Sequence, residues 1–333
     1  MRFDARPRCT LAQLPTPIEE LPRLTHELGG PRLLVKRDDQ TGLALGGSKV
    51  RKLEFLVGDA LAKGADTVVT AGLAQSNHCR QTAAAAAKAG MACELVLAGK
   101  RPEIPNCNLL LDLLCGANLH WTVHERRSER MNEIAESLRT AGRTPYVIPV
   151  GGSNGLGALG CAHAMVELQT QLSEPGRRID YIVFATSSGG TQAGMALGAR
   201  LSGFPGVVLG ISIDRKASKG HSYLTELAAI ANEGARILGV GEEFSEDDFV
   251  VNDDYLGGGY GVIGDLERRA IGLAAQTEGL ILDPVYTGRA MGGLIDLIER
   301  DFFSRTDAVL FWHTGGTPAL FAYAEELALI RNP

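Results

Sequence analysis

The chain has 333 residues and a formal net charge of −6 at pH 7, from 33 Lys and Arg against 39 Asp and Glu. Hydrophobic residues make up 45% and charged residues 22%, a balance typical of globular proteins that excludes a disordered chain. The acidic balance, with no long basic run, argues against a nucleic-acid or anionic-membrane partner. At about 150 residues per domain, the length predicts two domains.

Targeting signals are not evident in the sequence. The first residues carry charge and Pro7 and contain no apolar core of a signal peptide, and no uncharged apolar run reaches the roughly 18 residues of a membrane span. The six cysteines contain no C-x-x-C pair, which favours free thiols in a reducing compartment over disulfides or zinc ligands. We therefore expect a cytoplasmic protein without a membrane partner or a metal site.

Short β-branched runs alternate with segments of 3.6-residue periodicity. Strands are predicted at 33–36, 67–71, 93–97, 119–123, 146–148, 181–185, 207–213 and 308–312. Helices are predicted at 49–63, 77–89, 108–114, 128–140, 156–172, 191–201, 223–233, 263–277, 288–299 and 318–329. This alternation is typical of parallel sheets with helices on their faces, so the predicted fold class is α/β.

Two glycine patterns imitate nucleotide-binding signatures. Gly155-x-Gly157-x-x-Gly160 matches the dinucleotide fingerprint, but the next predicted strand ends without the acidic residue that binds ribose. The stretch 42–49 resembles a P-loop, but Val50 follows its lysine where Ser or Thr is needed for magnesium. Both functions are disfavoured. A third glycine-rich stretch, 257–261, predicts a mobile loop. The composition does not indicate whether this loop lies near a site.

Three polar turns are candidate binding sites. Ser187-Ser188-Gly189-Gly190-Thr191 follows a predicted strand and opens a helix, which suits either a phosphate or an ordinary capped turn. Gln75-Ser76-Asn77-His78 also starts a helix and could bind a carboxylate or merely cap that helix. The polar turns 283–288 and 313–318 follow apolar runs, where parallel sheets place ligands.

Lys49 follows Gly46-Gly47-Ser48 at a loop-to-helix junction. The positive helix end and partial burial would lower its pKa and make it a nucleophile, although a solvated first-turn lysine has the same sequence pattern. Its neighbours Arg51 and Lys52 are predicted to point elsewhere.

Six stretches together resemble one enzyme family in order and spacing: Lys36-Arg37-Asp38-Asp39, Gly46-Gly47-Ser48-Lys49-Val50-Arg51-Lys52-Leu53-Glu54, Gln75-Ser76-Asn77-His78, Gly151-Gly152-Ser153-Asn154, Asp283-Pro284-Val285-Tyr286-Thr287-Gly288 and His313-Thr314-Gly315-Gly316. Over nearly its whole length, the sequence resembles the pyridoxal-phosphate (PLP) enzymes of the D-cysteine desulfhydrase and aminocyclopropane-carboxylate deaminase family. The resemblance implies a tryptophan-synthase-β-like fold (fold type II), with two open parallel-sheet domains and the cofactor in their cleft. It also implies a homodimer, with residues 1–51 and 156–333 forming a large PLP-binding domain and residues 52–155 a small domain.

The resemblance also implies roles for individual residues. Lys49 corresponds to the lysine that binds the cofactor covalently, Asn77 to the partner of its phenolic oxygen, and Tyr286 to a tyrosine near its ring. The other implied contacts are Ser187, Ser188, Gly189, Gly190 and Thr191 for the phosphate, Ser76 with Gln75, Asn77 and His78 for the substrate carboxylate, and Thr287 with Thr314 for the pyridine nitrogen.

Three positions depart from the family pattern. Ser48 replaces an asparagine, and Arg289 replaces a lysine in what we expect to be a surface exchange. Aminocyclopropane-carboxylate deaminases have a glutamate at the position of Thr287, which keeps the pyridine nitrogen protonated and strengthens the electron sink. A threonine there disfavours cyclopropane opening and favours β-elimination.

The predicted function is PLP-dependent α,β-elimination on a small, cysteine-like amino acid, with D-cysteine giving pyruvate, ammonia and sulfide. L-Cysteate sulfo-lyase activity, which releases sulfite, is the first alternative, because residues 39–44 look slightly more like those enzymes. Aminocyclopropane-carboxylate deaminase, a β-replacement synthase and a non-catalytic PLP-binding relative are the others.

Overall fold

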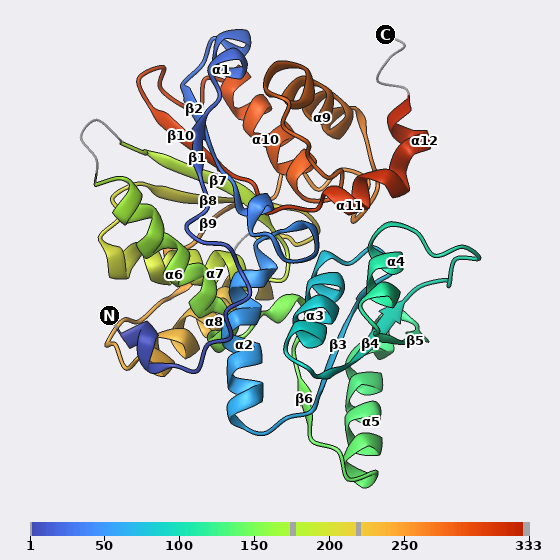
Figure 1. The fold of residues 1–333 in the computed structure, drawn as a ribbon. Helices are drawn as coiled ribbons and strands as arrows, with labels where there is room; N and C mark the ends of the chain where they lie inside the picture. Colours follow the sequence, from blue (N-terminus) through green and yellow to red (C-terminus); the bar gives the residue numbers. More distant parts are fainter. Residues whose placement is uncertain (1, 174–177, 218–220, 329–333) are drawn as a thin grey trace.

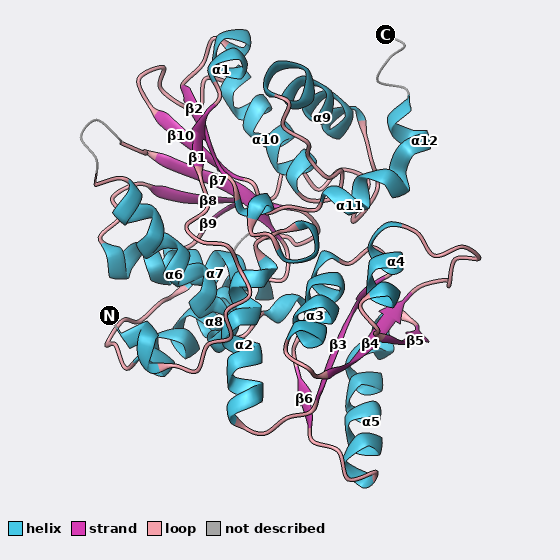
Figure 2. Cartoon of the chain, in the orientation of Figure 1, coloured by secondary structure: helices cyan, strands magenta, loops and turns pink. Residues whose placement is uncertain are grey.

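The computed structural model describes residues 2–173, 178–217 and 221–328. The larger of its two β-sheets has six strands (Figure 2). Its strand order is β1-β2-β10-β7-β8-β9, and every neighbouring pair is parallel except β1 with β2. The strands are β1 (Ile18–Glu20), β2 (Arg32–Lys36), β7 (Tyr181–Thr186), β8 (Val207–Ser212), β9 (Val250–Asn252) and β10 (Ala308–Trp312).

The smaller sheet has four parallel strands in the order β5-β4-β3-β6. They are β3 (Thr67–Leu73), β4 (Ala92–Ala98), β5 (Asn118–Thr122) and β6 (Pro145–Val147). All four lie within residues 52–155, and all strands of the larger sheet lie outside that range. This segregation supports our proposal that residues 52–155 form a small domain inserted into a larger one.

Helices cover both faces of the larger sheet (Figure 1). Helices α1 (Pro22–Leu28), α9 (Asp265–Glu278) and α10 (Thr287–Glu299) pack on one face, while α6 (Gly155–Gln171), α7 (Gly190–Ser202) and α8 (Ser222–Leu238) lie on the other side. Side chains alternate along β7: Val183 joins the core beneath α10, whereas Ile182 and Phe184 join the core beneath α6. Successive side chains of a strand point to opposite faces of the sheet, and both faces are buried here. The strands are therefore continuous hydrophobic runs in the sequence.

The smaller sheet is covered in the same way. Helices α2 (Lys49–Ala62), α3 (Asn77–Lys88) and α4 (Cys107–Leu114) share an apolar core with one face, and α5 (Arg127–Thr140) packs on the other. Val68 and Leu95 point into the first core, and Val69 and Val96 into the second.

The sequence-based elements are largely confirmed. All eight predicted strands are present within two residues of their expected bounds, but β1, β9 and α1 were not predicted. Helix α8 runs to Leu238 instead of 233. The helix predicted at 318–329 is instead three short pieces, α11 (Thr317–Leu320), η7 (Phe321–Tyr323) and α12 (Ala324–Leu327), and its predicted last residue lies outside the described residues.

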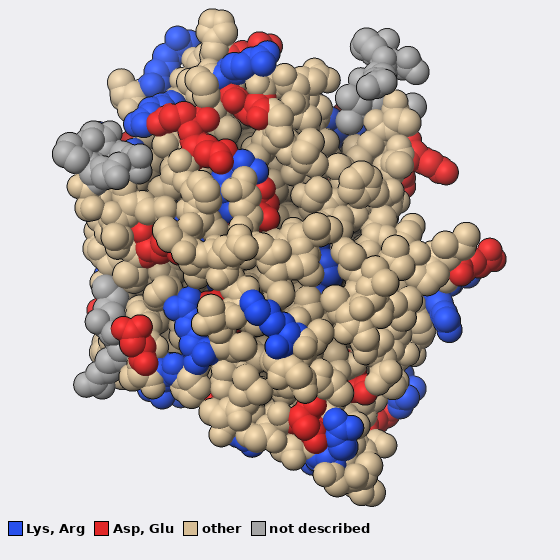
Figure 3. Space-filling model, in the orientation of Figure 1, with Lys and Arg blue, Asp and Glu red and all other residues tan. Residues whose placement is uncertain are grey.

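Charged side chains of both signs are interspersed on the face of the molecule shown in Figure 3, which matches the modest net charge. Among the described residues, no helix is both long enough and apolar enough to cross a membrane.

The glycines of the false dinucleotide pattern serve helix packing. A β-carbon at Gly157 would lie 2.1 Å from the carbonyl oxygen of Gly152, and one at Gly160 would lie 2.1 Å from that of Arg51. These glycines let α6 approach α2 and the turn before α6 closely, so the spacing reflects backbone contact rather than a nucleotide.

The close contact at Gly160 predicts that a side chain at this position lowers the stability of the protein. Gly160→Ala forces the α2 backbone at Arg51 to move, and we expect the free energy of unfolding to fall by roughly 1–3 kcal/mol, as for other overpacked sites. Urea denaturation at a fixed PLP concentration measures the change. Gly241→Ala is the control, because a β-carbon there meets nothing within 4 Å. Equal stability of the two variants would contradict the packing argument.

Candidate active site

A cavity of about 840 Å³ lies where the carboxyl ends of strands from both sheets face each other. Most of the sequence-predicted residues line it: Lys49, Ser76, Asn77, His78, Ser187, Ser188, Gly189, Thr191, Tyr286 and Thr314. Three predicted residues do not, namely Gln75, Gly190 and Thr287. The structure therefore brings together residues that are up to 265 positions apart, from Lys49 to Thr314.

The turn before Lys49 is built from glycines that accept no side chain. Gly46 and Gly47 have φ values of +70° and +128°, and a β-carbon at Gly46 would lie 1.8 Å from the carbonyl oxygen of Asp39. The Gly47 N–H donates to the Asp38 carbonyl at 3.0 Å, and the Ser48 N–H donates to the Thr314 carbonyl at 2.9 Å. These contacts place Lys49 as the first residue of α2, at the cavity.

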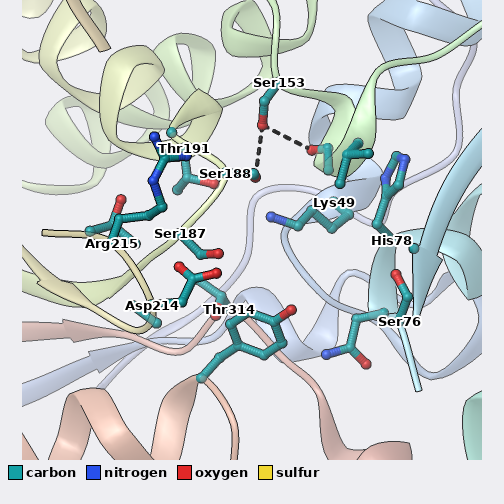
Figure 4. Close-up of a pocket in the computed structure, with 18 of the residues that line it drawn as sticks. Lys49, Ser76, His78, Ser153, Ser187, Ser188, Thr191, Asp214, Arg215 and Thr314 are labelled. Carbon is teal, nitrogen blue, oxygen red and sulfur yellow. Dashed lines mark hydrogen bonds between the residues drawn. The ribbon is translucent and has the colours of Figure 1, made fainter. Parts of the chain in front are cut away.

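Lys49 extends its amine into the middle of the cavity, with Ser187 and Ser188 on one side and Ser76 and His78 on the other (Figure 4). Burial lowers the pKa of Lys49. Burial, followed by the charge of Lys49, also lowers the pKa of Lys52 to about 7. A lowered pKa increases the fraction of a lysine that is neutral and can act as a nucleophile.

The expectation that Lys52 points elsewhere was wrong. Residues three apart on a helix share a face, and Lys52 stands one turn behind Lys49. Its amine donates to the Gly151 carbonyl at 3.2 Å and approaches the Ser153 hydroxyl at 3.4 Å. Arg51 does point away, into a buried network with Asp38 and Glu167.

The Ser187–Thr191 turn joins β7 to α7 and, with Ser153, forms a polar cradle. Gly189, with φ +84°, precedes the helix, and the Gly190 N–H donates to the Ser153 hydroxyl at 3.2 Å. Ser153 also donates to Ser188 at 2.8 Å, as Figure 4 shows. A β-carbon at Gly190 would lie 2.8 Å from both the Lys52 amine and the Ser153 hydroxyl and would displace these two groups of the cradle. Ser153 belongs to the stretch 151–154 that resembles the family, but the sequence alone indicates no role for it.

Ser76 is the N-cap of α3, and its hydroxyl accepts the Cys79 N–H at 3.2 Å. The capping interpretation is therefore correct, and Ser76 also lines the cavity. The Asn77 side-chain oxygen accepts from Asn108 at 2.9 Å, and Asn77 also lines the cavity. Gln75 turns away from the cavity and hydrogen-bonds to Asn106 and Asn108.

His78 is a neutral side chain. Burial, together with the nearby Lys49 and Lys52, lowers its pKa well below the usual value. The Thr70 hydroxyl donates to the Ile148 carbonyl at 2.8 Å, so it must accept from His78 Nε2 at 2.9 Å. His78 Nδ1 is then an unprotonated acceptor without a hydrogen-bond partner in the described part of the chain.

Two tyrosines form the opposite wall. Tyr286 and Tyr260 are hydrogen-bonded through their hydroxyls at 2.5 Å, and their rings meet edge to face with centroids 5.8 Å apart. Burial raises the pKa of Tyr286 well above its usual value, so its hydroxyl is protonated at neutral pH. Tyr260 belongs to the glycine-rich stretch 257–261, and its aromatic ring among glycines was the only sequence signal for this role.

Thr287 and Thr314 take different positions. The Thr287 hydroxyl is fully buried, donates to Asp283 Oδ1 at 2.8 Å and accepts the Asp283 N–H at the same distance. Its bonds hold the start of α10. Thr314 lines the cavity.

Several ionisable residues also bound the cavity: His124, Arg127, Asp214, Arg215 and Glu226. Arg215 and Glu226 form an ion pair at 2.8 Å, and Arg127 donates to the carbonyl and the ring of His124. Burial raises the pKa of Asp214, although Ser187 and nearby cations partly oppose that shift. Sequence reasoning found none of these five. It also placed Arg289 at the surface, whereas that side chain is 1% exposed.

Residues 9–315 match the family model described as "Pyridoxal-phosphate dependent enzyme". The chain belongs to this family. It is 43% identical over 327 residues to a D-cysteine desulfhydrase of Klebsiella pneumoniae (strain 342), covering 96% of this chain and 97% of that protein. It is 42% identical over 324 residues to a putative 1-aminocyclopropane-1-carboxylate deaminase of Pyrococcus abyssi (strain GE5 / Orsay), covering 96% and 95%.

Solved structures show the same fold. The crystal structure of an ACC deaminase homologue superposes with a TM-score of 0.89 at 39% identity, covering 98% of this chain and 97% of that one. O-ureido-L-serine synthase shares the fold at 18% identity, with a TM-score of 0.68 and coverage of 97% and 94%. The resemblance to the D-cysteine desulfhydrase and aminocyclopropane-carboxylate deaminase family, the fold type II architecture and the PLP cofactor are thereby confirmed.

The cavity fits this cofactor. The cradle at Gly190, two serine hydroxyls and the Lys52 amine suit a phosphate, and the Lys49 amine suits an aldehyde.

Gly190 tests the fit. Gly190→Ala brings a β-carbon within 2.8 Å of the Lys52 amine and of the Ser153 Cα, so we expect the Kd for PLP to rise about tenfold or more, or ~1.4 kcal/mol. Titration of the apoprotein with PLP, followed by cofactor absorbance, measures it. Gly241→Ala should bind PLP as the wild type does, and an unchanged Kd in Gly190→Ala would argue against a phosphate at this cradle.

Proposed function

We propose that this enzyme catalyses α,β-elimination on a cysteine-like amino acid, and that D-cysteine gives pyruvate, ammonia and sulfide. The observation that carries the proposal is the Lys49 amine, which stands in the cavity with a pKa lowered by burial. A neutral amine at this point can serve as a nucleophile and as a base. The 43% identity to a D-cysteine desulfhydrase over nearly the full length supports this substrate class.

The phosphate would bind at the Ser187–Thr191 turn, where Ser153 and Lys52 complete the donor set. The Asn77 amide nitrogen, directed by the bond from Asn108, would donate to the phenolic oxygen. Thr314, on the cavity wall, would lie at the pyridine nitrogen, with Thr287 supporting the wall from behind. PLP, when bound, withdraws electrons from the Cα of the amino acid.

The substrate carboxylate would bind at the start of α3. The Ser76 hydroxyl accepts from Cys79, so its own proton remains free to donate, and the helix N-terminus favours a negative charge. Gln75 would hold the segment 106–108 rather than the substrate.

Proton transfers fall to two residues on opposite sides of the cavity. Lys49 would remove the proton from Cα. The protonated Tyr286–Tyr260 pair faces the same space and would donate a proton to the leaving sulfur as the Cβ–S bond breaks. Water then hydrolyses the remaining three-carbon fragment to pyruvate and ammonia. We expect the enzyme to work as a homodimer in the cytoplasm, as the family resemblance implies.

Two alternatives each have a supporting observation. L-Cysteate, which would release sulfite, is favoured by Arg127, a guanidinium on the cavity wall that is bonded only to His124 among the described residues. Aminocyclopropane-carboxylate is favoured by Asp214, whose carboxylate lies beside Ser187 and Thr314 in Figure 4. This carboxylate would act as the acidic partner of the pyridine nitrogen, the role of the glutamate that the deaminases have at the position of Thr287.

A substrate panel separates these functions. The PLP-loaded enzyme is assayed with D-cysteine, L-cysteine, L-cysteate, D-serine, β-chloro-D-alanine and aminocyclopropane-carboxylate. Pyruvate with sulfide from D-cysteine is the expected result. Sulfite from L-cysteate or α-ketobutyrate from the cyclopropane would establish an alternative. A new amino acid formed on adding sulfide would indicate a β-replacement synthase. The absence of any product would favour a non-catalytic PLP-binding protein.

Lys49→Ala tests the base. We expect turnover to fall by about 10²- to 10⁴-fold or more, because the variant has lost its general base, and the absorbance of covalently bound cofactor to disappear. Lys63→Ala is the matched control, since Lys63 follows the end of the same helix and is exposed. Retention of that absorbance in Lys49→Ala would refute the assignment.

A further inference from the structure

Arg289 is a buried cation, 1% exposed, in the first turn of α10. Its Nε donates to Glu267 Oε1 at 2.6 Å. Its two terminal nitrogens donate to four main-chain carbonyl oxygens: those of Ile213 at 2.9 Å, Leu256 at 2.8 Å, Gly259 at 3.0 Å and Val262 at 2.7 Å. All three nitrogens of the guanidinium are therefore used, and four of its five partners are backbone.

Three of these carbonyls belong to the loop 256–262, which has no helix or strand of its own. Gly257, Gly259 and Gly261 all have positive φ, and only two backbone bonds close turns within the loop. Such a segment has high conformational entropy unless side chains hold it. Arg289 supplies that restraint: a β-carbon at Gly257 would lie 3.3 Å from its Nη2, so the loop packs directly on the guanidinium.

The same loop carries Tyr260 into the site. Tyr260 lines the cavity and meets the Tyr286 hydroxyl at 2.5 Å. Tyr286 is the N-cap of α10, three residues before Arg289. The guanidinium therefore connects the loop that carries Tyr260 to the helix that begins after Tyr286. Its fourth carbonyl, from Ile213, precedes the cavity residue Asp214.

A lysine, the residue expected here from the family pattern, could not replace these contacts. An ammonium offers three donors from one point, whereas the planar guanidinium offers five in a fixed fork. Glu267 balances the buried charge and also accepts the Gly264 N–H at 2.8 Å, which ties the end of the loop to α9.

We propose that Arg289 is a positioning residue that holds the loop 256–262 so that Tyr260 stays hydrogen-bonded to Tyr286. Its effect on turnover rests on the proposed function, in which the tyrosine pair donates a proton, but its effect on the loop does not. Removing the fork should loosen the loop, misplace the tyrosine pair and slow proton donation more than substrate binding.

The experiment compares R289K with R269K in the PLP-loaded enzyme. Arg269 is the matched control, because it lies on α9 and pairs with Glu299 of α10 at the surface. We expect R289K to speed amide hydrogen exchange in 256–262 and to lower kcat about tenfold to a hundredfold with little change in KM, while R269K changes neither. Kinetics use whichever substrate of the panel the wild type consumes.

A double-mutant cycle identifies the route of the effect. If Arg289 acts through Tyr260, R289K should cost little further kcat in a Y260F background. Fully additive losses, or wild-type exchange and kcat in R289K, would overturn the proposal. Faster exchange in 256–262 in an enzyme inactive on the whole panel would support the loop assignment while rejecting the proposed function.

Instability of R289K does not end the test. R289Q combined with E267Q leaves no unpaired buried charge and still removes the fork. It should show the same fast exchange at 256–262, and protected amides there would equally contradict the proposal.

Discussion

The active site depends on one backbone constraint, the turn at Gly46 and Gly47. Both residues have positive φ and are packed against the backbone of Asp39 and the side chain of Gln81, so no β-carbon fits at either. The turn is held from two directions, because Gly47 donates to the Asp38 carbonyl and Ser48 to the Thr314 carbonyl. The Asp38 side chain is in turn held by Arg51 at 2.8 Å. Burial would raise the pKa of Glu167, yet Arg51 and Lys36 lower it to about 2, so this carboxylate is ionised throughout the physiological range. Removing one partner of a buried ion pair typically costs about 3–5 kcal/mol of stability. The turn is rigid because any movement of it would disturb these buried contacts.

That rigidity explains how two amines can be buried side by side. Lys49 and Lys52 lie one helical turn apart, and no ion pair joins either to a carboxylate in the described part of the chain. Burial therefore lowers the pKa of both amines, and a bound anion would raise it again. A phosphate bound at Gly190 would compensate the charge of Lys52 and thereby leave Lys49 as the less protonated amine. Cofactor binding and the nucleophilicity of Lys49 are in this way two consequences of the same electrostatic arrangement.

The sequence predicted the parts of the molecule that are determined locally. Continuous apolar strands and capped helices were found because burial on both faces and N-cap chemistry leave local signals, as in β7 and at Ser76. Edge strands β1 and β9, three residues each, carry too few buried positions to give such a signal. Contacts between distant segments were missed for another reason. Arg289 is buried only because Glu267 and the carbonyls of a loop about 30 residues away converge on it, and nothing beside it in the sequence indicates that. Lys52 was predictable from helical spacing alone. The contact of Thr287 with the pyridine nitrogen stays a prediction, and in the structure the Thr287 hydroxyl donates to Asp283.

Helix α2 connects these levels. Its first residue is the cavity lysine, its third is in the ion network of the larger sheet, and its later turns contribute Leu53, Leu56 and Val57 to the core of the smaller sheet. A single rigid element thus has one end fixed in each half of the molecule. In the proposed function the phosphate binds at the Ser187–Thr191 turn of the larger sheet and the substrate carboxylate at the Ser76 turn of the smaller one. The packing of α2 against both sheets would then set the distance between cofactor and carboxylate. The close contact of Gly160 with the backbone of Arg51 is therefore a functional constraint as well as a structural one: a side chain there would displace the helix that carries Lys49 relative to the larger sheet.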